Sequence, residues 1–87
     1  MKHAAHRNFW QQYRTLLKEI RIKANKKYRL LRENPSHPSL HFKLVNAKKA
    51  LWSARVDIHY RALALKKEEG FIWIWIGNHS TYDKLIK

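Results

Sequence analysis

The chain has 87 residues, enough for one domain with a single modest hydrophobic core. Hydrophobic residues make up 45% of it, which excludes a disordered chain, and no apolar run approaches the roughly 20 residues that span a bilayer. The absence of cysteine excludes disulfides and thiolate metal sites, and the first residues lack the apolar core of a signal peptide. We therefore expect one cytoplasmic domain, residues 1–87, with no membrane segment.

Charge is the most pronounced property of the sequence. Nineteen lysine and arginine residues stand against six acidic residues, which gives a formal net charge of +13. Residues 1–50 contain 13 of the basic residues and two of the acidic ones, so the N-terminal half carries most of the excess. A protein with this charge favours a polyanionic partner, which could be nucleic acid or an acidic protein.

The first third of the chain predicts helices. Apolar residues recur at helical spacing from Phe9 to Ile20, and a second set continues to Leu31. We expect two helices, over about 5–16 and 18–33, because one continuous helix would project far beyond so small a domain. The proline at position 35 pushes the preceding asparagine out of the helical region and ends the second helix.

From residue 40 onward the apolar period becomes two, which predicts strands. The stretch LHFKLV is a first short candidate, and LWSARV and YRALALK follow it. The last two form either one long strand or two strands joined by a tight turn at 57–59. Their alternation of apolar and polar residues is typical of a half-buried antiparallel sheet.

The stretch FIWIWI at 71–76 is apolar on both faces, which predicts a central strand after a hairpin loop at 66–70. Gly77-Asn78 should end this strand, and residues 80–87 can form one or two helical turns. The predicted fold class is therefore α+β: an N-terminal helical hairpin (about 5–33) packs on a small twisted antiparallel sheet (about 40–76), and a short C-terminal segment (77–87) follows.

A cluster of chemically active side chains is predicted where FIWIWI ends. If the three strands form a meander, Arg55 and Arg61 lie on neighbouring strands near that end. His79 and Tyr82 follow the strand directly. Cleavage of RNA without a metal needs a base, an acid and cations around the phosphate, and histidine and arginine can supply these. The alternative is that the arginines are solvated and that His79 and Tyr82 only fasten the C-terminal turn to the sheet.

A second candidate surface is the basic face of the helices and the loop after them. It could bind nucleic acid through the phosphates without reading sequence. No acid or cysteine stands near the two histidines of the loop, so we expect neither a metal nor a cofactor. The residues assigned to this surface are Lys18, Arg21, Lys23, Lys26, Lys27, Arg29, His37, His41 and Lys43.

Three stretches in order, NPSHPSLHFKLV, WSARVDIHYRALAL and FIWIWIGNHSTYDKLIK, resemble the RelE/ParE superfamily of bacterial toxins. More narrowly they look like its small ParE-like or RelE-like chains that end in G-x-H-x-x-Y-D-K-L. The resemblance covers nearly the whole chain and implies a helical hairpin on a twisted antiparallel sheet, with a first strand shortened to the region of Lys2–Ala5. It also implies a toxin of a type II toxin–antitoxin pair, neutralised by an acidic or amphipathic antitoxin.

The superfamily implies two different targets. RelE-like members cut mRNA on the ribosome without a metal, whereas ParE-like members poison DNA gyrase. Arg61 matches the arginine of the superfamily's Tyr-Arg strand motif, and Arg55 falls at a basic position of the preceding strand. His79 matches the C-terminal histidine of the histidine-using nucleases, and Tyr82 falls near their C-terminal aromatic residue.

Among the other positions, one matches a nuclease element and others differ from the nuclease pattern. His37 resembles a His-Pro-Leu element of one nuclease branch. The sequence departs from the pattern at Ser53, where some nucleases place a lysine, and at His59, where one branch has an acid.

The resulting hypothesis is a metal-independent, ribosome-dependent mRNA endoribonuclease. His79 would be the general acid or base, Arg61 and Arg55 would hold the scissile phosphate, and Tyr82 would orient the base. The alternatives are a DNA gyrase inhibitor without nuclease activity and a non-toxic basic nucleic-acid-binding module.

Overall fold

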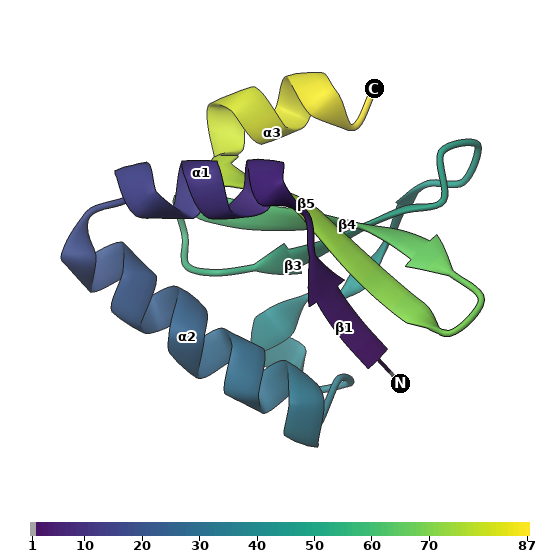
Figure 1. Ribbon diagram of the computed structural model, residues 1–87, viewed down its shortest axis with the longest axis horizontal. Coiled ribbons are helices and arrows are strands. Elements are labelled where there is room, and N and C mark those ends of the chain that lie inside the picture. The colour runs from purple at the N-terminus through teal and green to yellow at the C-terminus, as the bar shows by residue number, and fades with distance from the viewer. Residues whose placement is uncertain (1) are drawn as a thin grey trace.

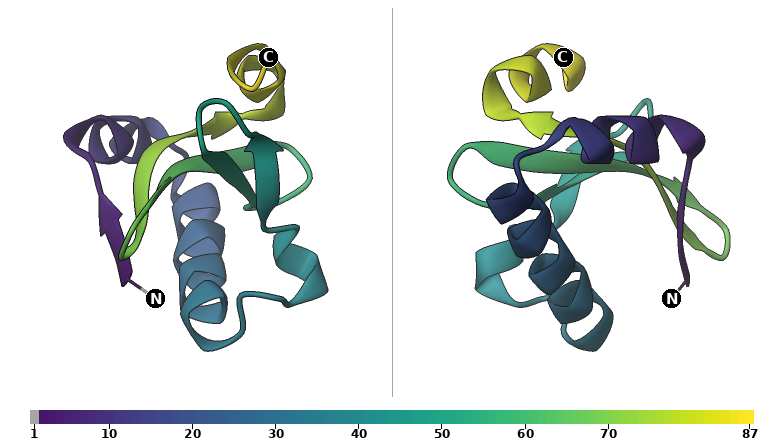
Figure 2. Two further views of the ribbon diagram at one scale, coloured as in Figure 1. Left: turned by 90° about the vertical axis from the view of Figure 1, so that its right-hand side faces the viewer. Right: turned by 60° about the vertical axis from the view of Figure 1, so that its left-hand side comes forward.

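The computed structural model describes residues 2–87 as a five-stranded sheet with helices on both faces (Figure 1). Figure 2 shows α3 above the sheet and α2 below it. No helix among the described residues is long and apolar enough to cross a membrane. In chain order the elements are β1 (Lys2–Ala5), α1 (Arg7–Thr15), α2 (Lys18–Glu33), a 3₁₀ turn (Pro38–Leu40), β2 (Lys43–Asn46), β3 (Leu51–Arg55), β4 (Tyr60–Lys67), β5 (Gly70–Asn78) and α3 (His79–Leu85).

The predicted break between the two helices falls at residues 16–17. Leu16 is buried, and its extended backbone (ψ 150°) turns the chain. Arg21 in α2 donates from Nη1 to the carbonyl of Leu16 at 2.7 Å, so a side chain of the second helix caps the end of the first. The first helix begins later than predicted: Ala5 belongs to β1, and His6 caps α1 by accepting the N–H of Asn8 at 3.1 Å.

The sheet has the order β1-β5-β4-β3-β2. All neighbouring pairs are antiparallel except β1 and β5, which run parallel. The α+β prediction is therefore confirmed, and the chain between β3 and β4 forms a turn at 56–59 rather than one long strand. β5 lies inside the sheet, as expected for FIWIWI, although β4 occupies the centre.

β5 continues two residues beyond its predicted end. Gly77 and Asn78 pair with Arg61 and Tyr60, and Asn78 also caps α3 by accepting the N–H of Thr81 at 3.0 Å. The asparagine therefore ends the strand and starts the helix at once. This places His79 rigidly at the first position of α3.

A bulge explains why the two tryptophans of β5 lie on opposite faces of the sheet. Leu63 pairs with Trp75 and Ala64 with Trp73, so Ile74 has no partner in the ladder. Strict alternation would put both tryptophans on one face. Instead Trp73 belongs to the main core under the helical hairpin, whereas Trp75 packs against the smaller core under α3.

Candidate functional site

Two histidines meet where β4 begins and β5 ends. The N–H of His79 donates to the carbonyl of His59 at 2.8 Å. The two imidazole rings are exposed, with centroids 6.3 Å apart and planes tilted by 32°. No hydrogen bond joins the two rings, so the nitrogen atoms of both are open to a substrate. The pair has the geometry for one proton acceptor and one proton donor on the same substrate.

The two predicted arginines lie in the next row of the sheet. Arg55 pairs with Arg61 across β3 and β4, and Arg61 pairs with Gly77 across β4 and β5. The ladder therefore brings the arginines and His79 to one end of the sheet. The guanidinium of Arg61 folds back on its own turn, where Nη1 donates to the carbonyl of Asp57 at 2.6 Å and to that of Tyr60 at 3.0 Å.

Asp57 organises the turn between β3 and β4. Its Oδ1 accepts the N–H groups of His59 at 2.8 Å and of Tyr60 at 2.9 Å, and its Oδ2 lies 3.4 Å from Nζ of Lys23. Burial alone would raise the pKa of this carboxyl. The two N–H groups and the ammonium outweigh burial and hold the pKa below its usual value.

Arg55 points toward the helices, where a basic hollow lies between α2, the residues after the 3₁₀ turn and the end of β3. Its Nη1 lies 3.4 Å from Nε2 of His41. Lys27 of α2 donates from Nζ to the carbonyl of Ser39 at 3.1 Å, and burial together with the nearby Arg55 lowers the pKa of Lys27. Lys23 and Lys26 complete the basic lining. Cations from three parts of the chain that converge in one hollow suit a phosphate or carboxylate ligand.

The remaining residues assigned to nucleic-acid binding divide by their contacts. Arg21 is engaged at the break between the helices. The Nδ1 of His37 accepts the N–H of Ser39 at 3.2 Å and lies 2.9 Å from its hydroxyl, so this ring fastens the 3₁₀ turn. The residues that stay exposed on the surface outside the hollow are Lys18, Arg29 and Lys43.

Tyr82 lies inside the smaller core and not beside the histidines. Its side chain packs with Leu51 and Leu63, and its hydroxyl donates to Oγ of buried Ser53 at 3.0 Å. A ring in this position has no exposed face for a nucleobase. This burial agrees with the alternative in which Tyr82 fastens α3 to the sheet.

His59 is the residue at this site that sequence reasoning missed as a functional candidate. The available signal was its place two residues before Arg61, at the end of a turn. Among residues 2–87, no group of three histidine, cysteine or acidic side chains is arranged to hold a metal ion.

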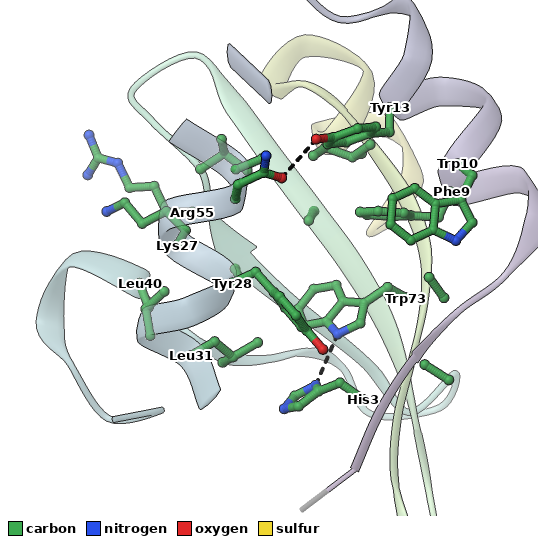
Figure 3. Close-up of a pocket in the computed structure, with 18 residues that line it drawn as sticks. His3, Phe9, Trp10, Tyr13, Lys27, Tyr28, Leu31, Leu40, Arg55 and Trp73 are labelled. Carbon is green, nitrogen blue, oxygen red and sulfur yellow. Dashed lines mark hydrogen bonds between the residues drawn. The ribbon is translucent and has the colours of Figure 1, made fainter. Parts of the chain in front are cut away.

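An apolar cavity of about 240 Å³ separates the helical hairpin from the sheet (Figure 3). Aromatic rings from α1, α2 and β5 line it, among them Trp10, Tyr28 and Trp73. The indole N–H of Trp73 donates to Nδ1 of His3 at 3.1 Å, and burial lowers the pKa of that histidine. At its other end the cavity reaches Lys27 and Arg55, so it adjoins the basic hollow.

Comparison with known families identifies the class of protein. A family model described as the ParE-like toxin domain matches residues 18–84, which is most of the chain. The chain therefore belongs to the ParE-like toxin domain family, in agreement with the resemblance noted from the sequence. No curated protein matches the chain by sequence.

Solved structures share the fold at low sequence identity. The chain is similar to a YoeB/ParE toxin from Agrobacterium tumefaciens (TM-score 0.69, 18% identity, covering 91% of this chain and 99% of that one). A RelB–RelE antitoxin–toxin complex from Methanococcus jannaschii is also similar (0.74, 10%, 97% and 99%). YafQ from an Escherichia coli strain matches comparably (0.72, 14%, 93% and 96%). These matches show that the fold is that of the RelE/ParE superfamily.

Proposed function

We propose that this protein is the toxin of a type II toxin–antitoxin pair and cleaves mRNA on the ribosome without a metal ion. The observation that carries the proposal is the exposed His59–His79 pair at the strand end that also bears Arg61. The two imidazoles and Arg61 supply the base, the acid and the positive charge that phosphodiester cleavage requires.

In this mechanism one of the two imidazoles removes the proton from a ribose 2′-hydroxyl. The resulting oxygen attacks the adjacent phosphorus, and the bond from phosphorus to the 5′-oxygen breaks. The other imidazole, in its protonated form, donates a proton to that leaving oxygen. Arg61 stabilises the negative charge that builds on the phosphate oxygens in the transition state. Arg55, which points into the basic hollow, helps to hold the RNA backbone there. Because Tyr82 is buried, we give it no part in the reaction.

The basic hollow and the exposed cations of α2 would hold the RNA backbone of the ribosome or the mRNA. They supply charge without base-specific contacts, so they favour docking on a large polyanion. Codon preference would then depend on the ribosomal site in which the mRNA is presented, and not on a nucleobase pocket of the toxin.

The expected partner is an acidic or amphipathic antitoxin. The similarity to the toxin fold of a RelB–RelE complex supports this expectation, as does the surface itself. The apolar cavity beside Lys27 and Arg55 suits a segment that carries apolar side chains on one face and acids on another.

The test is a reconstituted translation reaction in which mRNA ends are mapped after the purified protein is added. We expect cleavage on the ribosome, and a loss of about 10²-fold or more in the cleavage rate for His79→Ala and for His59→Ala. Lys84→Ala, an exposed change in the last turn of α3, is the matched control and should cleave normally. Intact mRNA with the unaltered protein at full ribosome occupancy would contradict the proposal.

A gyrase inhibitor without nuclease activity is the second candidate. The family description, ParE-like, and the serine at position 53, where some nucleases have lysine, favour it. A DNA supercoiling assay separates the two functions. Inhibited gyrase together with intact translation would replace the nuclease proposal by this one.

A further inference from the structure

We propose that Asp57 is the positioning residue of the histidine–arginine site, because its carboxylate and carbonyl fix the turn that carries His59 and the guanidinium of Arg61. The inference rests on the proposed nuclease function, because that proposal supplies the catalytic histidines and the arginine that Asp57 would position. It goes beyond that function by assigning a role to an acid that does not itself touch the substrate.

Asp57 contacts two members of the site directly, His59 and Arg61, and is linked to a third, His79, through the backbone of His59. One carboxylate oxygen accepts two consecutive N–H groups, those of His59 and Tyr60. The main-chain carbonyl of Asp57 accepts Arg61 Nη1 at 2.6 Å. The carbonyl of His59 in turn accepts the N–H of His79 at 2.8 Å, so the turn also sets the distance between the two imidazoles.

An ion pair also connects the turn to the helices. Oδ2 of Asp57 lies 3.4 Å from Nζ of Lys23 in α2, and the Asp57 side chain is only 14% exposed. The turn is therefore held from the sheet side by its own backbone bonds and from the helix side by an ion pair. Ile58, at the tip of this turn, is 64% exposed, so little packing is available to replace these polar contacts.

Removing this support should impair catalysis more than binding. The two imidazoles would still be present, but their spacing would no longer be fixed, and misplacement by about 1 Å can cost about 10²-fold in rate. The affinity for RNA comes chiefly from the cations of the basic hollow and of α2, all of which remain, so it should change little. A residue that only stabilised the fold would not produce this split.

The variants separate the roles of the carboxylate. Asp57→Ala removes both N–H acceptors and the ion pair. Asp57→Asn retains an oxygen for the two N–H groups and removes only the charge. Glu68→Gln changes an exposed acid in the β4–β5 turn and serves as the control.

The first measurement is single-turnover cleavage of ribosome-bound mRNA. We expect Asp57→Ala to lower the maximal rate by about tenfold or more while the half-saturating concentration changes by less than about twofold. The rate of Asp57→Asn should stay within about threefold of the unaltered protein, because both N–H bonds remain. A lower melting temperature for Asp57→Ala with an unchanged maximal rate would overturn the proposal.

The second measurement needs no activity. By NMR, Asp57→Ala should lose the contacts between the His59 and His79 rings and should show faster hydrogen exchange at the amides of His59 and Tyr60. Retained ring contacts and unchanged exchange would overturn the positioning role. If the unaltered protein does not cleave mRNA, the nuclease proposal fails, while this measurement still decides whether Asp57 fixes the geometry.

Discussion

Tyr82 and Ser53 share a hydrogen bond inside the smaller core. The burial of this pair indicates a structural role for the tyrosine. The hydroxyl of Tyr82 donates to Oγ of Ser53 at 3.0 Å, and both side chains are more than nine-tenths buried. A buried hydroxyl left without a partner is costly, whereas removal of both partners is nearly neutral. The serine therefore has a structural role as the hydrogen-bond acceptor of the tyrosine hydroxyl.

We predict that Tyr82→Phe lowers the free energy of unfolding by about 1–2 kcal/mol and that Ser53→Ala has a similar effect. The double variant should be less destabilised than the sum of the two single ones, because neither partner is then left unpaired. Denaturant-induced unfolding measures these differences.

The same variants test the structural role. Cleavage per folded molecule should be unchanged in Tyr82→Phe. A large loss of cleavage in a fully folded Tyr82→Phe protein would contradict a purely structural role and would support the catalytic role expected from the sequence.

At the residue scale, sequence reasoning located the arginines and His79 because strand periodicity and the end of a strand are local signals. It placed Tyr82 with them only by proximity along the chain. It did not single out His59 and Asp57, because the hydrogen bonds across the turn and the ion pair to α2 follow from no spacing rule. An aspartate at this position predicts a turn from the sequence. Its hydrogen-bond and ion-pair partners become apparent only once the helices and strands are packed together.

At the scale of elements, Gly70 determines how β1 joins the sheet. Gly70 has φ 158°, and a Cβ at this position would overlap the carbonyl of Lys2 in the neighbouring parallel strand. Since the obstacle is backbone, it can move only if β1 moves with it. The glycine is therefore required by close approach of two strands.

We expect Gly70→Ala to destabilise the protein by about 1–3 kcal/mol, with much of the loss local to β1. Unfolding curves measure the total, and hydrogen exchange at the amides of residues 2–5 measures the local part. Glu69→Gln removes the exposed ion pair with Lys2 next to the same strand and should leave stability nearly unchanged. Equal effects of the two changes would refute the role of close approach.

The elements themselves differ in how far the sequence predicts them. The break at 16–17 follows from the length of the apolar pattern, since a single helix would leave its buried face without a partner. The bulge at Ile74 does not follow from any local signal. FIWIWI is apolar at every position, so its pattern fixes neither the register nor the faces of its side chains, and pairing with β4 decides both.

At the scale of the whole molecule, we do not expect all the cations behind the net charge of +13 to take part in RNA binding. Several cations line one hollow between α2 and the sheet, whereas others, such as Lys84 on α3, lie on the opposite face of the sheet. Only cations that contact phosphates release counterions on binding, so the salt dependence of RNA binding distinguishes the two groups.

We predict that Lys26→Gln reduces the slope of log affinity against log salt concentration by about 0.7 for a single-stranded RNA. Lys84→Gln, with the same loss of charge, should leave this slope unchanged. Titrations over a range of salt concentrations provide the measurement. Equal reductions in both variants would mean that the RNA senses the total charge and not the hollow.

The short strand β1 also has a consequence for self-association. It pairs in parallel with the first half of β5, the most apolar strand of the protein, and covers an edge that would otherwise present unpaired N–H and C=O groups beside phenylalanine, isoleucine and tryptophan. β1 and β5 are also far apart in the sequence, so this pairing closes the longest loop in the sheet, and we expect it to form late in folding. Until this pairing forms, the unpaired edge of β5 is free to form hydrogen bonds with a strand of another copy. The residues of β1 therefore protect against aggregation as well as completing the sheet.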